Sequence, residues 1–325
     1  MPNPTSSLAT LRPDLATFLE FELEMEKSGY VADKVFPVID VASQAGTFGK
    51  IPLEQLLQAR DTKRNPGSGY SRGNWTFVSS SYSCEEHGAE EPVDDREAKM
   101  YREYFDAEVI STARAFNAVL TNAEKRVADA VFNTTTWNGA SLTTGITHEW
   151  DDATNCVPLT DVEAAVQKVY DNSGLWANAL IINRKVFRNL RNSDQVIERI
   201  NSAGAGNPTK ASDVTVQMLA AVFDLPYIIV AGSSRNSAAE GQSATPTQVW
   251  SGEYAMVCKI ATGADMKEPC IGRTFHWSED GSSIGGTVET YRDETVRGDI
   301  VRVRHDVDEI VLYPEAGHLL SNITT

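Results

Sequence analysis

The stretch from Asp94 to Phe132 constrains the fold more than any other part of the sequence. Its apolar positions recur at steps of three and four, which is typical of one side of an α-helix, and neither proline nor glycine interrupts it. Acidic residues at its start, Asp94, Asp95 and Glu97, favour the positive end of a helix dipole. The stripe runs through Tyr101, Phe105, Val109, Thr112, Phe116, Val119, Ala123, Val127 and Val131.

A single helix over this stretch would be roughly 58 Å long at 1.5 Å per residue. A compact protein of 325 residues has a radius of gyration of about 20 Å and therefore a diameter near ~50 Å. We therefore expect a flattened or elongated subunit that is completed by neighbouring copies.

The composition is that of an ordinary soluble protein, with 41% hydrophobic and 23% charged residues. Its longest apolar runs are too short to cross a bilayer, and the N-terminus lacks the basic start and apolar segment of a secretion signal. The four widely spaced cysteines are therefore expected to be free thiols. A formal charge of −16 without a basic stripe argues against a protein that grips nucleic acid and favours a container.

The first 45 residues resemble an arm, with an amphipathic helix near Ala16–Glu26 and a strand-like piece at Val35–Val41. A two-stranded excursion follows between Gly46 and Val93, with half-extended pieces near Ile51–Leu57 and Trp75–Tyr82. Its glycine-rich tip is basic. An isolated hairpin is barely stable in water, so we expect a neighbouring copy to hold it.

Residues of this tip, and tryptophans near loops, are candidate contacts between subunits because aromatic residues and arginine concentrate in interfaces. The acidic run Cys84–Asp95 would offer a complementary surface on the next copy, in a head-to-tail arrangement. The candidate contacts are Arg60, Lys63, Arg64, Arg72, Trp75 and Trp250.

The rest of the chain predicts a mixed α+β fold. A helix over Asp161–Tyr170, capped by Thr160, opens a compact part, and a loop rich in Ser, Ala and Gly spans Gly232–Thr247. Strands Thr287–Arg292 and Ile300–Leu312 form a closing hairpin. Between them we expect strands at Ala179–Ile182, Tyr227–Val230 and Tyr254–Ile260, and helices at Lys185–Arg191, Asp194–Ile200 and Val214–Phe223.

One motif suggests an enzyme. Residues 281–285 match the G-x-S-x-G pattern of a hydrolase nucleophile, Ser283, and Asp306 and His318 follow in the order of that family. The nucleophile turn needs a strand before it and a helix after it, whereas the flanking sequence here is typical of a hairpin. We therefore predict no catalytic residue, and a serine hydrolase using Ser283 is the rival of another class.

Histidine and cysteine positions give no metal site. Cys84 and His87 have a ligand-like spacing, but a structural zinc needs four donors and no second pair exists, so a buried thiol and a surface histidine are the better interpretation. His305 alternates with valines and is expected to be packed or hydrogen-bonded. We predict no metal and no cofactor.

Five stretches resemble the major capsid proteins of tailed bacteriophages, which share the Hong Kong 97-like shell fold with encapsulins. The N-terminal stretches are ADKVFPVIDVASQAGTFGKIP and NWTFVSSSYSCEEHGAEEPVDDREAKM. GLWANALIINRKVFRNLRN and VTVQMLAAVFDLPYIIVAG resemble the axial domain. The segment from Glu268 to Ile323 resembles the part that returns to the peripheral domain.

This resemblance implies an N-terminal arm over 1–46, an extended E-loop over 47–93 and a peripheral P-domain with a spine helix over 94–155. It implies an axial A-domain over 156–283 and a return to the P-domain with the chain end over 284–325. A separate scaffolding protein, or none, is implied, and no covalent cross-link is carried over to Lys50 or Lys63.

By the same resemblance, the chain would be a structural subunit and not an enzyme, assembling into pentamers and hexamers of an icosahedral head. The head would be built in the host bacterial cytoplasm, become part of the virion and enclose double-stranded DNA without sequence-specific binding. Scaffolding, portal and decoration proteins are possible partners, and no membrane is involved. An encapsulin-like compartment is the nearest alternative.

Overall fold

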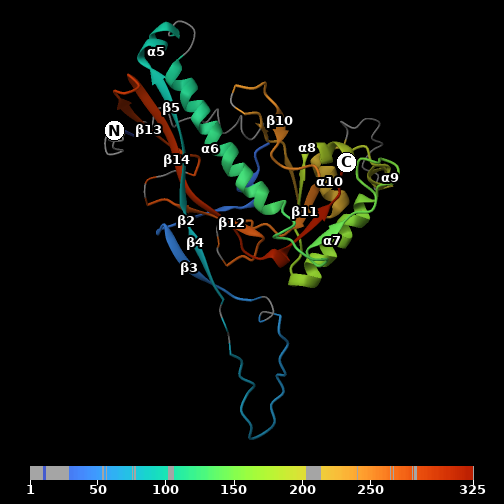
Figure 1. The fold of residues 1–325 in the computed structure, drawn as a ribbon. Coiled ribbons are helices and arrows are strands. Elements are labelled where there is room, and N and C mark those ends of the chain that lie inside the picture. Colours follow the sequence, from blue (N-terminus) through green and yellow to red (C-terminus); the bar gives the residue numbers. More distant parts are fainter. Residues whose placement is uncertain are drawn as a thin grey trace.

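The computed structural model describes residues 10–11, 29–52, 55, 57–74, 76, 78–101, 106–202, 214–239, 241–263, 265, 267–279, 281 and 284–324. Two mixed sheets lie side by side, one long helix crosses between them, and a hairpin extends far beyond the body (Figure 1). The mixture of helix and strand confirms the predicted α+β class. No helix in these ranges is long and apolar enough to span a membrane.

The first sheet is built around β14 (Gly298–Val311), which pairs with three other strands. Its antiparallel pairing with β13 (Thr287–Asp293) confirms the predicted closing hairpin. It also pairs with β5 (Glu85–Asp94), so the acidic run is a strand, which its sequence did not predict. The strand order is β1-β13-β14-β12-β2, and the other members are β1 (Thr10–Leu11), β2 (Val38–Val41) and β12 (Gly272–Trp277).

The long helix is shorter than the sequence predicts. Helix α5 (Asp95–Tyr101) and helix α6 (Ala107–Val131) are separate, because Asp106 adopts an extended backbone with φ −83° and ψ 113°. Its side chain accepts a hydrogen bond from the backbone N–H of Glu108 at 3.1 Å, which is the geometry of an N-cap. The prediction of one uninterrupted 39-residue helix is therefore wrong, and the 25 residues of α6 span about 38 Å.

The apolar stripe of α6 is confirmed, and it serves two cores. Phe116 and Val119 pack with valines of β13 and β14 beneath the first sheet. Val127 and Val131 pack with residues of the second sheet and with α3 (Ala32–Val35). Helix α6 therefore joins the two halves of the body.

The second sheet has the order β6-β15-β11-β7-β8, and β7 is buried at every position. Its strands, and the helices that cover it, match the predicted positions within a few residues. Helix α7 is the exception: it begins at Pro158 without a side-chain cap, because proline suits the first helical position, so the predicted Thr160 cap is wrong. The elements are β6 (Thr143–Gly145), β7 (Ala179–Asn183), β8 (Tyr227–Ala231), β11 (Tyr254–Cys258), β15 (Gly317–Ser321), α7 (Pro158–Ser173), α8 (Arg184–Leu190), α9 (Asp194–Ser202) and α10 (Val216–Phe223).

The hairpin consists of β3 (Ala45–Lys50) and β4 (Val78–Ser83), joined by the long connection that forms its tip. The two-stranded excursion is confirmed, but its first strand precedes the predicted Ile51–Leu57. A smaller hairpin of β9 (Ser234–Asn236) and β10 (Pro246–Gln248) occupies the predicted loop. The predicted arm helix near Ala16–Glu26 lies outside the described residues.

The strands cross the domain boundaries drawn from the sequence. Strand β12 belongs to the first sheet although it falls within the predicted A-domain, and β15 belongs to the second sheet although it follows the predicted return to the P-domain. Strand β5 falls within the predicted E-loop but pairs along β14. The domain division remains a proposal, and one that follows the sheets would group these strands differently.

Candidate functional site

Aromatic side chains fasten the base of the β3–β4 hairpin to the body. The Tyr82 ring stacks on Phe275 of β12 at 4.8 Å between centroids, and Phe48 lies at 5.5 Å from the same ring. Phe275 is fully buried. One ring of the body thus holds both strands of the hairpin at their root.

Polar contacts with β14 and the residues after it complete this attachment. The backbone N–H of Ser83 donates to Asp308 Oδ2 at 2.8 Å. On the other strand, the Lys50 ammonium donates to the carbonyl of Leu312 and lies 4.1 Å from the ring centroid of Tyr313. These contacts fix where the hairpin leaves the body.

Beyond its base the hairpin is exposed. Residues 57–74 are all exposed, including Leu57 and Tyr70, whose exposed fractions are 59% and 73%. The Arg64 guanidinium packs over the Tyr70 ring at 4.9 Å and donates to the carbonyl of Ser68. Such a surface, rich in apolar area and cations and lying beyond the body, is typical of a contact with another molecule.

The structure places the four predicted basic contacts on this exposed part. Arg60, Lys63, Arg64 and Arg72 are all exposed. The Arg60 guanidinium lies against Gly73 on the opposite side of the hairpin, where a Cβ atom would overlap it. Trp75 lies outside the described residues.

The predicted acidic surface is largely engaged within the subunit. Glu90 of β5 accepts from Arg302 at 2.7 Å, and Glu91 pairs with Arg114 at 3.5 Å. The Asp95 carboxylate accepts two hydrogen bonds from Arg292, which lower the pKa of Asp95. Most of the acidic run therefore holds β5 and α5 to the body.

A second acidic surface lies where β13 turns into β14, at the end of the body that carries α5. Figure 1 shows this end at the top and the hairpin tip at the bottom. The Glu294 side chain is 86% exposed, and Asp299 is about half exposed at 47%. The cations of the tip and these carboxylates thus lie at opposite ends of the molecule.

A buried carboxylate ties the N-terminal segment to α6. Glu124, only 1% exposed, accepts from the backbone N–H groups of Val31 and Ala32 at 2.8–3.1 Å. It also accepts from the indole N–H of Trp250 at 2.5 Å and the hydroxyl of Ser233 at 3.4 Å. Burial raises the pKa of Glu124, and the hydrogen bonds from Trp250, Val31 and Ala32 partly offset that rise.

Trp250 is a correction to the predicted contacts. Its ring is 1% exposed and packs edge-on against Phe132 at 5.1 Å, so it belongs to the core and not to a subunit surface. An exposed tryptophan was missed instead: Trp176, 59% exposed, lies edge-on to Tyr170 at 5.6 Å. Glu124 was missed as well, although its place in a row with Phe116, Leu120 and Ala128 at steps of four marked it as inward-facing.

The geometry does not support the hydrolase alternative. The G-x-S-x-G motif lies between β12 and β13, with no helix after it, and Ser283 lies outside the described residues. Asp306 is on β14 and pairs with Arg304, whereas His318 is on β15 of the other sheet. The His318 ring bonds to Thr144 Oγ1 at 2.9 Å and to the carbonyl of Ser141 at 3.0 Å.

The cysteines and histidines are structural. All four cysteines are buried and free, as predicted. Burial raises the pKa of Cys84 to about 11, so its thiol stays protonated and is a poor metal ligand. His305 is buried and bonds to the carbonyl of Ile284 at 3.2 Å, as predicted, while His87 is half-buried and edge-on to it. No group of three or more metal-binding side chains occurs in the described ranges.

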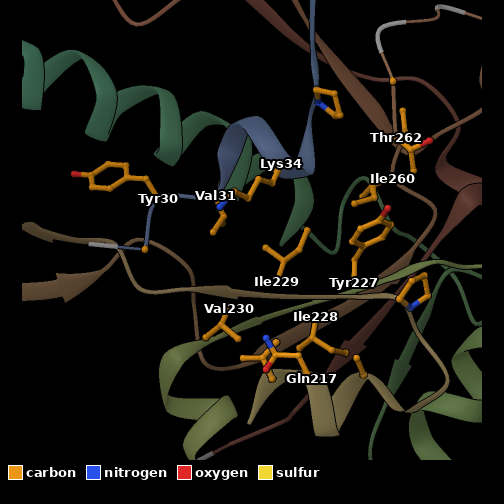
Figure 2. A pocket seen from close by; sticks show the side chains of 17 residues that line it. Tyr30, Val31, Lys34, Gln217, Tyr227, Ile228, Ile229, Val230, Ile260 and Thr262 are labelled. Atoms are coloured by element: carbon orange, nitrogen blue, oxygen red, sulfur yellow. The ribbon is translucent and has the colours of Figure 1, made fainter. Parts of the chain in front are cut away.

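One open groove of 730 Å³ runs between the segment after Gly29 and strand β8 (Figure 2). Ile228, Ile229 and Val230 form its floor, and Tyr30 and Val31 form the opposite wall. Lys34 is the one charged side chain among the described residues that line it. This lining offers no acid–base pair for catalysis.

Comparison with solved structures identifies the fold. A phage-related protein from Bordetella bronchiseptica is 21% identical, with a TM-score of 0.68 over 97% of this chain and 98% of the other. The capsid structure of cyanophage P-SCSP1u is 12% identical, with a TM-score of 0.58 over 88% and 86%. A virus-like particle from Pyrococcus furiosus is 15% identical, with a TM-score of 0.52 over 93% and 96%.

No protein-family model and no curated protein matches the chain. The structural matches confirm the predicted fold: the chain has the Hong Kong 97-like shell fold, over nearly its whole length.

Proposed function

We propose that this chain is the structural subunit of an icosahedral shell, the major capsid protein of a tailed phage, whose copies form pentamers and hexamers around double-stranded DNA. The observation that supports this most is the β3–β4 hairpin, which is fastened at its base and exposed along residues 57–74. A segment that cannot bury itself on its own body gains contacts when another copy lies beneath it. The fold is one that capsid structures share.

The proposed mechanism is geometric. Unlike surfaces at the two ends of each copy would meet head-to-tail, and such contacts close into rings. Arg60, Lys63, Arg64 and Arg72 of one tip would face the acidic end around Glu294 and Asp299 of the next copy, with Trp75 as a further contact. Opposite charges at the two ends give this pairing direction and register.

The enclosed DNA would be held without sequence-specific recognition. The net charge of −16 disfavours a tight grip on phosphates, so packaged DNA would stay free to move within the shell. Scaffolding, portal and decoration proteins are proposed partners. Assembly would take place in the bacterial cytoplasm, and the shell would become part of the virion.

Charge reversal at the tip tests this proposal. The purified chain is expected to form closed particles by electron microscopy, whereas the double variant Lys63→Glu/Arg72→Glu is expected to remain as smaller, folded species. Adding Glu97→Lys and Glu294→Lys at the other end should restore particles, because the attraction is restored with reversed signs. Particles of unchanged yield and shape in the tip variant would contradict the proposed contact.

An encapsulin-like compartment is the second candidate, because the virus-like particle from Pyrococcus furiosus shares the fold. The contents of particles from the native source separate the two. Double-stranded DNA inside the shell supports the capsid, and an enclosed enzyme supports the compartment.

A further inference from the structure

A polar groove of 520 Å³ lies between α6 and β9, on the face of the helix away from the first sheet's valines. Helix α6 contributes a stripe of polar side chains at helical spacing, and β9 contributes Arg235 and its two neighbours. The lining includes three cations, Arg114, Lys125 and Arg235, and one acid, Glu91. In a chain of net charge −16, this is an unusual local excess of positive charge.

The cations remain accessible despite their partners within the subunit. Arg114 pairs with Glu91 at 3.5 Å, yet its side chain is 69% exposed. Lys125 pairs with Asp129 one turn along the helix, and its side chain is 36% exposed. Both therefore retain surface that an acidic ligand would contact.

The N-terminal part of the chain enters the body at one end of this groove. The Tyr30 hydroxyl contacts Asn117 at 3.3 Å and Thr121 at 2.7 Å, and both of these residues line the groove. Gly29 accepts a hydrogen bond from the backbone N–H of Gly232, two residues before β9. The bonds from Val31 and Ala32 to Glu124 fix this entry point.

The preceding residues have the opposite charge. Residues 12–28 carry five acids and two bases, and four of the acids are Glu20, Glu22, Glu24 and Glu26. This stretch links Leu11, on β13 of the first sheet, to Gly29. Its eight residues 19–26 reach about 26 Å when extended, and the α6 side of the groove from Arg114 to Lys125 is about 17 Å long.

We propose that the groove between α6 and β9 binds the acidic stretch 12–28 of its own chain. Its carboxylates would lie against Arg114, Lys125 and Arg235, within a few residues of the point where the chain is already fixed. The stretch would then cover the polar face of α6 and connect the edge of the first sheet to the β9–β10 hairpin. The proposal depends on the groove and the chain path, and not on shell assembly.

Hydrogen–deuterium exchange of the full-length chain tests the contact. In the double variant Arg114→Glu/Arg235→Glu, exchange in residues 12–28 should accelerate roughly fivefold, since exposed ion pairs contribute modestly. The matched control Arg188→Glu/Arg199→Glu, on α8 and α9, should leave it unchanged. Adding Glu22→Arg and Glu24→Arg to the groove variant should restore protection, which a merely misfolded variant would not do.

Cross-linking separates the chain's own stretch from that of another copy. A bismaleimide should join cysteines introduced by Glu24→Cys and Asn122→Cys, because the four native cysteines are buried. In a mixture of isotopically labelled and unlabelled protein, the cross-linked peptides should come from one chain. Equal exchange in the groove variant and the wild type, or cross-links only between labelled and unlabelled chains, would overturn the proposal.

Discussion

At the scale of single residues, Glu124 holds more of the structure together than any other side chain described above. Four donors from three separate segments converge on one carboxylate in the middle of α6. A carboxylate is an acceptor only, so it matches a shell of donors that an amide would not.

Glu124→Gln is expected to destabilise the protein by about 2–4 kcal/mol, because its amide group places a donor against other donors. Urea unfolding measures the loss, and near-ultraviolet circular dichroism reports the changed setting of Trp250. The exposed control Glu163→Gln should change neither. Wild-type stability in Glu124→Gln would mean that the convergence of donors contributes nothing.

His305 predicts a dependence of stability on pH. Burial lowers its pKa to about 4, with the nearby Arg126 and His87 adding to the effect and Glu309 opposing it. The unfolded chain, in which this histidine titrates near pH 6.5, therefore binds the proton first. Stability from this group is complete above pH 6.5 and is lost as pH falls toward 4, by roughly 3 kcal/mol at 1.36 per unit.

The variant His305→Gln should show a weaker fall in melting temperature between pH 6.5 and 4 than the wild type. The exposed His148→Gln is the matched control and should follow the wild type. An identical acid profile for wild type and His305→Gln would refute the assignment.

Residue-level burial was only partly predictable. His305 and the cysteines were predicted correctly because alternation and cysteine chemistry depend on local sequence. Trp250 was not, since a tryptophan beside a polar loop gives no sign of a carboxylate 126 positions away that accepts its N–H. The exposure of Trp176 was equally invisible, because it depends on how α7 ends.

At the scale of elements, Asp106 decides the length of the central helix. It lies in a sequence with helical periodicity on both sides, so periodicity alone predicts one rod. Its side chain bonds to the backbone of Glu108 and begins a new helix instead.

Asp106→Ala is expected to cost about 1 kcal/mol, because the first turn of α6 loses its cap. Thermal unfolding measures the loss, and Asp106→Asn, which retains a capping oxygen, should keep most of the stability. A gain in stability and helicity in Asp106→Ala would indicate that the break between α5 and α6 is imposed by this residue against helix propensity.

Strand β5 could not be predicted from its own sequence, which is acidic and contains a proline. It is a strand because β14 supplies complementary arginines at matching register: Glu90 lies opposite Arg302. Such information belongs to a partner more than 200 residues away. The β13–β14 hairpin was predictable because its turn and its alternation are local.

At the scale of the whole molecule, the predicted elongated subunit has a different origin from the one inferred. The long helix is about a third shorter than expected, and the reach comes from the hairpin instead, which projects far beyond the body (Figure 1). The fold class and the excursion were predictable from the sequence. The membership of β12 and β15 in their sheets was not, because it depends on contacts between distant segments.

The most direct test is the mass of the particles formed by the full chain and by a chain in which residues 57–74 are replaced by a short Gly-Ser link. Sedimentation velocity should show the full chain in large closed particles. The shortened chain, with unchanged far-ultraviolet circular dichroism, should remain as folded small species. A full-length chain that stays a compact monomer at high concentration would contradict the account.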